Sequence, residues 1–383
     1  MPSRLMKEAL GMARRGVGRT HPNPAVGAVV VQDGRVVGRG YHRGPGTAHA
    51  EVVALRQAGP RAQGSTLVVT LEPCRHVGRT PPCTEAILAH GVRRVVAALP
   101  DPNPVASGGA EWLRQHGIPV ELGDGAREAL LLNLPFLSWV VRGRPWVTMK
   151  AAASVDGRVA TRTGESRYLT GPEARQHVHR VRSRIDALVV GSGTILSDDP
   201  ELTARGVMRA RDPVRVILDT RGRVPPSARL LQTGSVAPTL VYTGEETPVD
   251  FERALYQAGA EVVRVGVKHG HVALDEVMRD LGERGLLAVL VEGGPTIHGA
   301  FLEAGLYDSV ALYWAPMMLG GEARPLIAGA PLDALADAWR LTPPRLTRLG
   351  PDVLYTAEFV HSWEEMTARC LPDWLKRPAA SPS

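Results

Sequence analysis

The stretch from His49 to Cys83 decides how the rest of this 383-residue chain is interpreted. In order, it contains His49-Ala50-Glu51, Pro73-Cys74 and, after eight further residues, Cys83. One imidazole and two thiolates are ligands that suit Zn²⁺, and they leave a fourth coordination position for water. Glu51 is too close in sequence to His49 to be a convenient ligand, so it is placed to move protons. Because zinc lowers the pKa of bound water, the pattern indicates a hydrolytic site of the zinc-deaminase type.

The spacing of the two cysteines leaves an alternative and raises a question. A closed structural zinc site would need a fourth ligand, and His76 is the neighbouring candidate. The cysteines are separated by eight residues, whereas cytidine deaminases usually have a Cys-x-x-Cys pair. The loop between them must therefore have a further role, and it contains residues that could line a pocket: Arg75, His76, Arg79 and Thr80.

Two polar residues before this stretch are candidates for substrate contacts. Asn23 lies between two prolines in the rigid turn His21-Pro22-Asn23-Pro24. It is either a turn residue only, or its amide hydrogen-bonds a heterocycle or a ribose, and the zinc motif favours the second role. His42 follows a predicted strand, and for it the two interpretations are equally open.

Composition describes a folded protein of two domains. Hydrophobic residues make up 44% and charged residues 22%, which is typical of globular chains. A chain of 383 residues is longer than a single hydrophobic core usually supports. There is no apolar run of about 18 residues and no signal-peptide pattern, so we expect neither a membrane span nor export. Three cysteines, two of them in the zinc motif, favour a reducing compartment, the cytoplasm, with Cys370 an unused thiol.

The net charge of +6 points to anionic partners. The 45 Lys and Arg residues are scattered, and aromatic residues are only 5%, too few for a base-stacking surface. This distribution favours phosphorylated small molecules and dinucleotides over nucleic acid.

The periodicity of residues 1–123 predicts a three-layer α/β domain with a mixed sheet. Helices are expected at 4–15, 49–58, 84–90 and 108–116, and strands at 25–31, 35–39, 66–71, 93–98 and 120–122. Residues 124–144 are expected to connect two domains, with an apolar helical segment interrupted at Pro135.

Residues 145–361 predict a second α/β domain, followed by a partly disordered tail at 362–383. Strands are expected at 146–151, 187–190, 215–219, 239–242, 261–265, 287–291, 309–315 and 353–360, with helices at 172–183, 251–258, 274–284 and 297–304. No Gly-x-Gly-x-x-Gly follows a strand, so a Rossmann site is not indicated. Phosphates would instead bind backbone N–H groups at Gly293-Gly294, before a helix, although such a turn alone is more often an ordinary connection.

Motifs in both halves resemble one family over residues 1 to about 360. They are His21-Pro22-Asn23-Pro24, Thr70-Leu71-Glu72-Pro73-Cys74, His76 to Cys83, Lys150 to Gly157, Gly164-Glu165-Ser166, Gly193 to Pro200, Leu202-Thr203-Ala204-Arg205 and Val291-Glu292-Gly293-Gly294. With them the chain is similar to the RibD family of bifunctional riboflavin-biosynthesis enzymes, for which the long spacing between the cysteines is usual.

The resemblance implies two activities. A cytidine-deaminase-like domain would deaminate 2,5-diamino-6-(5-phosphoribosylamino)pyrimidin-4(3H)-one, with zinc on His49, Cys74 and Cys83. Glu51 would be the acid/base, and Asn23, His42 and His76 would contact substrate. A dihydrofolate-reductase-like domain would then use NADPH to reduce the ribosyl group of 5-amino-6-(5-phosphoribosylamino)uracil to ribityl. A homo-oligomer, dimer or tetramer, is expected, with no nucleic-acid or membrane partner.

The resemblance also assigns positions in the second domain. The cofactor contacts would be Ala153, Tyr168, Thr194, Asp198, Thr220, Gly294, Pro295, Thr296, Ile297, His298, Gly299 and Ala300. The substrate contacts would be Ser166, Arg182, Leu202, Arg205 and Glu292. An arginine pair suits a 5′-phosphate, although Arg182 alone would be read as a solvated charge. Lys150 and Glu292 are weaker candidates for proton movement at the ribose.

Two rival functions remain at this level. A nucleic-acid base deaminase would share the zinc chemistry but would leave the second domain unexplained. A nucleotide-binding protein without turnover would not need the intact zinc and reductase motifs.

Overall fold

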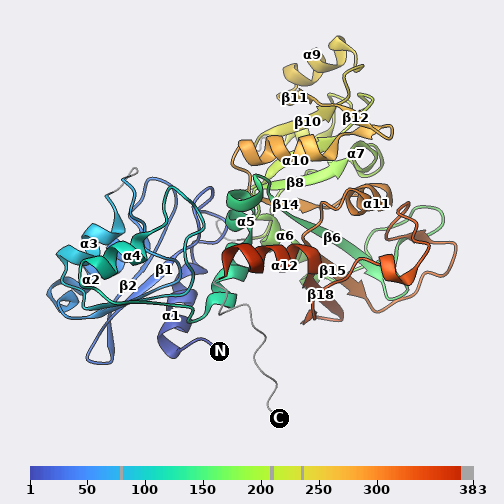
Figure 1. Ribbon diagram of the computed structural model, residues 1–383. Coiled ribbons are helices and arrows are strands. Elements are labelled where there is room, and N and C mark those ends of the chain that lie inside the picture. Colours follow the sequence, from blue (N-terminus) through green and yellow to red (C-terminus); the bar gives the residue numbers. More distant parts are fainter. Residues whose placement is uncertain (78–80, 208–210, 234–236, 372–383) are drawn as a thin grey trace. The chain divides into compact units, whose positions relative to one another are not determined.

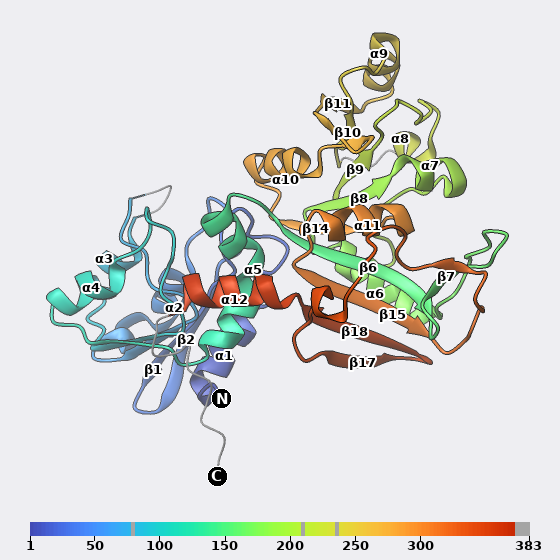
Figure 2. The same ribbon diagram turned by 45° about the vertical axis from the view of Figure 1, so that its right-hand side comes forward.

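The chain folds into two compact units, each with its own sheet (Figures 1 and 2). The computed structural model describes residues 1–77, 81–207, 211–233 and 237–371. One unit comprises Met1–Gly143 and the residues from Glu364 onward, and the other comprises Arg144–Trp363. Within the described ranges, no helix is both long enough and apolar enough to cross a membrane.

The first unit contains a mixed five-stranded sheet, as predicted. In spatial order its strands are β2 (Arg35–Tyr41), β1 (Gly27–Gln32), β3 (Thr66–Val69), β4 (Arg94–Ala97) and β5 (Val120–Leu122). Strand β1 is antiparallel to both β2 and β3, whereas β3, β4 and β5 run parallel. The parallel strands therefore end at one edge, where the loop containing Cys74 leaves β3.

Helices cover both faces of this sheet and make it the middle of three layers. The helices are α1 (Arg4–Ala13), α2 (Ala50–Ala58), α3 (Cys83–Ala89), α4 (Gly109–Gln115) and α5 (Ala126–Arg142). A Cβ on Gly27 would lie 2.1 Å from the carbonyl oxygen of Ala9 in α1, and one on Gly40 2.0 Å from that of Ala50 in α2. Gly40 pairs with the residue after Gly27, so the two helices approach opposite faces. The predicted three-layer fold is confirmed.

Helix α5 is continuous through Pro135, where the sequence predicted an interruption. A proline in a helix removes one backbone hydrogen bond. Here the neighbouring Leu134, Phe136 and Leu137 are buried, and their packing compensates for the lost bond. The helix also holds the first unit together, because the Asn133 amide accepts from the Ala25 N–H at 2.8 Å and donates to its C=O at 3.2 Å.

The second unit contains a nine-stranded sheet. Its spatial order is β11 (Glu261–Arg264), β10 (Thr239–Thr243), β9 (Val214–Leu218), β8 (Ala187–Gly191), β14 (Ala288–Val291), β6 (Trp146–Ser154), β15 (Ser309–Ala315), β18 (Asp352–Glu358) and β17 (Arg345–Leu349). The strands from β11 to β15 are parallel, and β18 and β17 continue the sheet antiparallel. Strand β17 was not predicted, because most of its residues are exposed and no buried face marks it.

Two layers of helices enclose this sheet. One face carries α10 (Leu274–Glu283) and α11 (Pro295–Glu303), and the other carries α7 (Ser192–Asp198), α8 (Arg229–Gln232) and α9 (Val249–Gln257). Alternate residues of the central strands enter the two cores: Val189 and Val216 enter one, and Leu188 and Ile217 enter the other. Helix α6 (Pro172–Arg182) packs near Tyr313 and Leu354. The α/β fold predicted for this half is confirmed.

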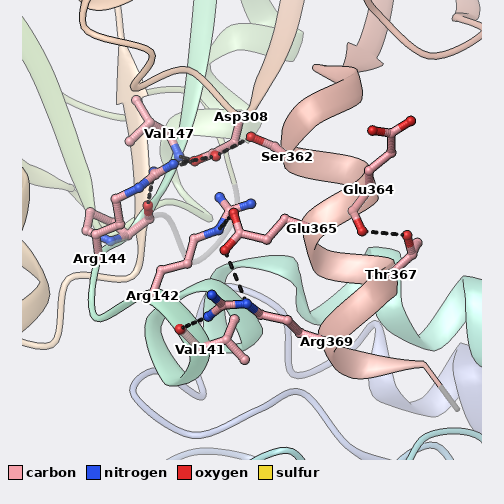
Figure 3. Close-up of polar contacts among 11 residues, drawn as sticks. Val141, Arg142, Arg144, Val147, Asp308, Ser362, Glu364, Glu365, Thr367 and Arg369 are labelled. Carbon is pink, nitrogen blue, oxygen red and sulfur yellow. Dashed lines mark hydrogen bonds and ion pairs between the residues drawn. The ribbon is translucent and has the colours of Figure 1, made fainter.

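A helix, α12 (Val360–Cys370), occupies the start of the segment predicted as a partly disordered tail. In the second unit, Ser362 donates to Asp308 at 2.7 Å, and Asp308 also accepts both Arg144 bonds at 2.8 Å (Figure 3). In the first unit, Glu365 pairs with Arg142 at 2.9 Å, and Cys370 is 2% exposed. Residues 372–383 lie outside the described part of the chain.

Candidate active sites

The three predicted metal ligands come together at the carboxyl edge of the first sheet. His49 directly precedes α2, Cys74 follows β3, and Cys83 begins α3. His49 Nδ1 lies 3.1 Å from Cys83 Sγ and 3.5 Å from Cys74 Sγ. A tetrahedral zinc ion would hold nitrogen and sulfur ligands roughly 3.5 Å apart. The donor set and its spacing therefore fit Zn²⁺.

The two thiols share a hydrogen bond that shifts their pKa values in opposite directions: this bond, followed by burial, raises the pKa of Cys83 well above its usual value. A hydrogen bond with Cys83 is the largest cause that holds the pKa of Cys74 well below its usual value. A thiolate is the form in which cysteine binds zinc. In the described ranges, His49, Cys74 and Cys83 form the one group of potential ligands within 4.8 Å of one another. His76 is not part of it, so this geometry gives no closed four-ligand site.

Glu51 lies in the first turn of α2, beside the ligands but outside their set. Its side chain is buried, with the residue 3% exposed. Burial, followed by the negative charge of Cys74, raises the pKa of Glu51 to about 7. A carboxyl group that titrates near neutrality can both accept and return a proton.

A cavity of about 440 Å³ opens onto the metal ligands and contains all three predicted substrate contacts. Asn23 Nδ2 lies 3.0 Å from His42 Nε2, and His42 Nδ1 lies 3.4 Å from the Ala48 carbonyl. This chain of contacts assigns Nδ1–H as a donor to Ala48 and Nε2 as an acceptor from Asn23. Burial lowers the pKa of His42, which favours the neutral form that this role needs.

The loop between the cysteines contributes His76 to the cavity. His76 Nδ1 is buried and has no hydrogen-bond partner among the residues that the structure describes. Such an atom is suited to a ligand contact. Arg79 and Thr80, which the sequence also offered as pocket residues, lie outside the described residues.

The sequence did not single out several residues of this cavity. Asp101 and Asn103 line it, and burial raises the pKa of Asp101 to about 7. The Glu72 carboxylate stabilises their loop, because it accepts hydrogen bonds from the N–H of Asp101 at 3.0 Å and from the N–H of Ala110 at 2.8 Å. One clue was available: residues 101–104 repeat the Pro-Asn-Pro pattern of residues 22–24. Phe136 and Trp139 of α5, which the sequence assigned to a connector, also line the cavity.

In the second unit, Glu292 is the centre of a charged network. Arg182 binds it in bidentate fashion through Nε and Nη2, both at 2.8 Å, and Lys150 Nζ lies 3.3 Å away. The Glu292 side chain is only 9% exposed. Burial alone would raise the pKa of Glu292, but the charges of Arg182 and Lys150 outweigh it and hold the pKa below its usual range. The two arginines that were predicted to suit the substrate phosphate therefore have separate partners in the structure. Arg182 binds the Glu292 carboxylate, and Arg205 pairs with Glu201.

Two larger cavities flank this network. A cavity of about 540 Å³, which we name the substrate cavity, contains Ser166, Arg182, Leu202 and Arg205, together with Lys150. A cavity of about 690 Å³, which we name the cofactor cavity, contains Glu292 and most of the predicted cofactor contacts. These contacts are Thr194, Asp198, Thr220, Gly294, Pro295, Thr296, Ile297 and Ala300.

Four residues predicted to touch the cofactor lie elsewhere. Tyr168 lines the substrate cavity, with Arg175 stacked 4.4 Å from its ring centroid. Ala153 is buried in β6, and a Cβ on Gly299 would lie 1.9 Å from the Ala328 carbonyl, so Gly299 serves close packing. His298 is 1% exposed and lines a separate cavity of about 110 Å³ beside Lys150 and Glu292.

His298 is a buried histidine, and one of its two ring nitrogens has a hydrogen-bond partner. Its Nδ1 lies 2.7 Å from Tyr307 Oη, and its Nε2 has no partner among the described residues. Burial, followed by the charge of Lys150, lowers the pKa of His298 to about 4. The imidazole is therefore neutral at physiological pH.

Two family models match this chain. The cytidine and deoxycytidylate deaminase zinc-binding region matches residues 1–99, and the RibD C-terminal domain matches residues 145–355. Each model falls within one of the two units: the first includes the three metal ligands and Glu51, and the second includes Glu292 and its two cationic partners.

Relatives match over nearly the whole length. The riboflavin biosynthesis protein RibD of Bacillus amyloliquefaciens is 43% identical over 354 residues, 92% of this chain and 95% of the relative. That of Escherichia coli is 41% identical over 361 residues, 91% of this chain and 96% of the relative.

Solved structures agree. Acinetobacter baumannii RibD has a TM-score of 0.83 at 38% identity, covering 93% of this chain and 98% of the other. A diaminohydroxyphosphoribosylaminopyrimidine deaminase/5-amino-6-(5-phosphoribosylamino)uracil reductase of Thermotoga maritima has a TM-score of 0.80 at 34% identity, covering 93% of this chain and 97% of the other.

Proposed function

This chain belongs to the RibD family of riboflavin biosynthesis proteins, and from that premise we propose which of its residues carry out the two reactions. It is a bifunctional enzyme that uses zinc and NADPH. It deaminates 2,5-diamino-6-(5-phosphoribosylamino)pyrimidin-4(3H)-one and then reduces the ribosyl group of 5-amino-6-(5-phosphoribosylamino)uracil to ribityl. The observation that carries the assignment of the first site is the buried Glu51 beside the His49, Cys74 and Cys83 cluster.

In the first unit, Glu51 moves the protons of deamination. His49, Cys74 and Cys83 hold the zinc ion, which when bound supplies a water molecule of lowered pKa. Water replaces the amino group at C2 of the ring, and ammonia leaves. Glu51 takes a proton from the attacking water and delivers it to the departing amine, a role that its pKa of about 7 supports. Asn23, held by His42, and His76 orient the pyrimidine.

In the second unit, Lys150 handles the proton of ring opening. NADPH when bound supplies the hydride that reduces C1′ of the ribosyl group. The bond between C1′ and the ring oxygen breaks as the hydride bonds to C1′, and the released oxygen needs a proton to become a hydroxyl, which Lys150 Nζ, oriented by Glu292, is placed to supply. Ser166, Leu202 and Arg205 hold the substrate, with Arg205 on its 5′-phosphate.

The cofactor lies in the cofactor cavity, where Thr194, Asp198 and Thr220 contact it. Its phosphates meet the backbone N–H groups at Gly294 and the first turn of α11, where the helix dipole favours anions. Support comes from the cavity's position at the carboxyl ends of β8, β9 and β14, the usual ligand edge of a parallel sheet.

A Glu51→Gln variant tests the first assignment. Glutamine preserves the shape of the side chain but cannot exchange protons, so ammonia release should fall by at least about a hundredfold. The zinc content, measured by atomic absorption, should remain that of the wild type. A zinc-loaded Glu51→Gln protein with full deaminase activity would refute the role.

We also propose that the protein is a cytoplasmic homo-oligomer, dimer or tetramer, that does not bind nucleic acid. The edge strand β17 supports assembly, since Leu346 on it is 62% exposed. The three cysteines are free thiols, which supports a reducing compartment. Light scattering of the wild type and a Leu346→Lys variant tests the assembly: a monomeric wild type would contradict it.

A further inference from the structure

One end of the cofactor cavity contains an arginine to which neither reaction assigns a role. Arg221 lines this cavity just after β9 and is exposed. It makes no hydrogen bond or ion pair with any residue that the structure describes. An arginine without a counter-charge on the wall of a ligand cavity is suited to an anionic group of the ligand.

The direction of the cofactor in its cavity follows from the cavity walls. The substrate cavity and the cofactor cavity share Val159, Ser166 and Asp198, so the two ligands meet there. The nicotinamide must lie at this shared end, because hydride passes directly to C1′. The adenosine must then lie away from this shared end, and Arg221 and His271 line the cofactor cavity outside it.

The sheet supports the same direction. Lys150 is on β6, and the order from there is β14, β8 and β9, all parallel. Arg221 follows β9, three strands from β6, which is roughly 14 Å at about 4.8 Å between neighbouring strands. The diphosphate would lie between, at Ser192 after β8 and Gly294 after β14.

The turn that carries Arg221 is rigid. The Gly222 N–H donates to the Asp219 carbonyl at 3.2 Å, and the Asp219 carboxylate accepts from the N–H groups of Arg223 and Val224 at 2.6 and 2.8 Å. Thr220 Oγ1 accepts from the Val272 N–H at 3.0 Å, which fixes the neighbouring loop. The Cα of Arg221 is thus held in place while its guanidinium has no partner in the described part of the chain.

Arg223 differs from Arg221 although both line this end. Its Nη2 donates to Ser192 Oγ at 2.8 Å, and its Nε lies 3.8 Å from Asp219. Arg223 is therefore directed toward the region of the diphosphate, which NADPH and NADH share. The group that distinguishes the two cofactors is the 2′-phosphate on the adenosine ribose.

We propose that Arg221 selects NADPH over NADH by binding the 2′-phosphate of the adenosine ribose, an inference that rests on the proposed cofactor cavity. The chemistry is a charge-assisted, bidentate contact between a guanidinium and a phosphate dianion. NADH lacks this phosphate, so Arg221 does not contribute to its affinity.

The test compares kcat/KM for NADPH and NADH in the zinc-loaded, full-length enzyme. Arg221→Ala should lower the value for NADPH by about 10- to 100-fold, mostly through KM, and should change that for NADH less than about twofold. Arg221→Lys should recover part of the NADPH value. Arg223→Ala should lower both values by a similar factor, and Arg253→Ala, an exposed α9 residue paired with Asp250, should change neither.

A binding measurement makes the test independent of turnover. Calorimetry with adenosine 2′,5′-bisphosphate and with 5′-AMP should show that Arg221→Ala loses affinity for the first only. Equal loss for both nucleotides, no loss, or an NADPH-selective loss in Arg223→Ala alone would overturn the assignment. If the wild type binds neither NADPH nor the bisphosphate, the proposed cofactor cavity is itself wrong.

Discussion

Glu292 is the single residue on which the reductase site depends most, because it neutralises two cations in a nearly closed space. In Glu292→Gln, Arg182 and Lys150 would retain their charges without the counter-charge. We expect the second unit to lose about 3 kcal/mol of stability, since removing one partner of a buried ion pair leaves the other unpaired. Reductase activity should disappear, while ammonia release persists.

Differential scanning calorimetry measures this loss. Glu322→Gln is the matched control, because the Glu322 and Arg162 side chains are 85% and 72% exposed and form only a surface pair. Its melting temperature should remain that of the wild type. An unchanged melting temperature in Glu292→Gln would contradict the account of the network.

His298 gives the second unit a specific dependence on pH. Its pKa is about 4 in the folded protein, below the ordinary value of 6.5. Between these values the unfolded chain binds the proton more readily, so acidification destabilises the folded state. The stability that the neutral His298 contributes to the folded state is fully present above pH 6.5 and is lost as the pH falls toward 4.

Urea unfolding at two pH values tests this dependence. From pH 7.5 to 5.0 the wild type should lose about 2 kcal/mol more than His298→Asn, which keeps a polar group near Tyr307. Equal losses in the two proteins would show that His298 does not titrate as described.

The individual ligands of the zinc site could be predicted because they are close in sequence and each has distinctive chemistry. The contacts of Glu292 could not, since Arg182 precedes it by 110 residues and only the fold brings the two together. Arg182 was instead predicted, from the resemblance to the family, to contact the substrate as one of an arginine pair suited to its phosphate. In the structure its Nε and Nη2 donate to Glu292 and its Nη1 donates to the Thr203 carbonyl.

At the scale of elements, α5 is part of the deaminase site. Asn133→Ala would leave the N–H and C=O of Ala25 without partners, beside the turn that carries Asn23. We expect a loss of about 2 kcal/mol and a higher KM for deamination, with NADPH oxidation unchanged. Gln115→Ala on α4, an exposed residue, is the control. A wild-type deaminase KM in Asn133→Ala would show that α5 does not position the turn.

The elements that sequence patterns missed have physical explanations. Pro135 predicts a break, but the helix around it is stabilised by packing that local sequence does not reveal. Strand β17 has no buried face, so the alternation that identifies half-buried strands is absent. Helix α12 lies in a region adjoining a Pro- and Ser-rich end, and its contacts with Arg142 and Asp308 come from distant parts of the chain. Central strands such as β8 and β14 are continuous apolar runs, β9 is apolar except for Arg215, and all three were predicted correctly.

At the scale of the whole molecule, the two chemistries occupy separate units. The metal ligands lie entirely in the first unit, and the network of Glu292 lies entirely in the second. Removing zinc should therefore stop deamination and leave the second active site intact.

The assignment of one reaction to each unit is tested most directly by an assay that measures ammonia release and NADPH oxidation together, with and without a chelator. With the diaminopyrimidine substrate, we predict one ammonia released for each NADPH oxidised, and the chelator should stop both. With 5-amino-6-(5-phosphoribosylamino)uracil, NADPH oxidation should continue in the presence of the chelator. Ammonia release from metal-free protein, or loss of NADPH oxidation with the deaminated substrate, would contradict the assignment of one reaction to each unit.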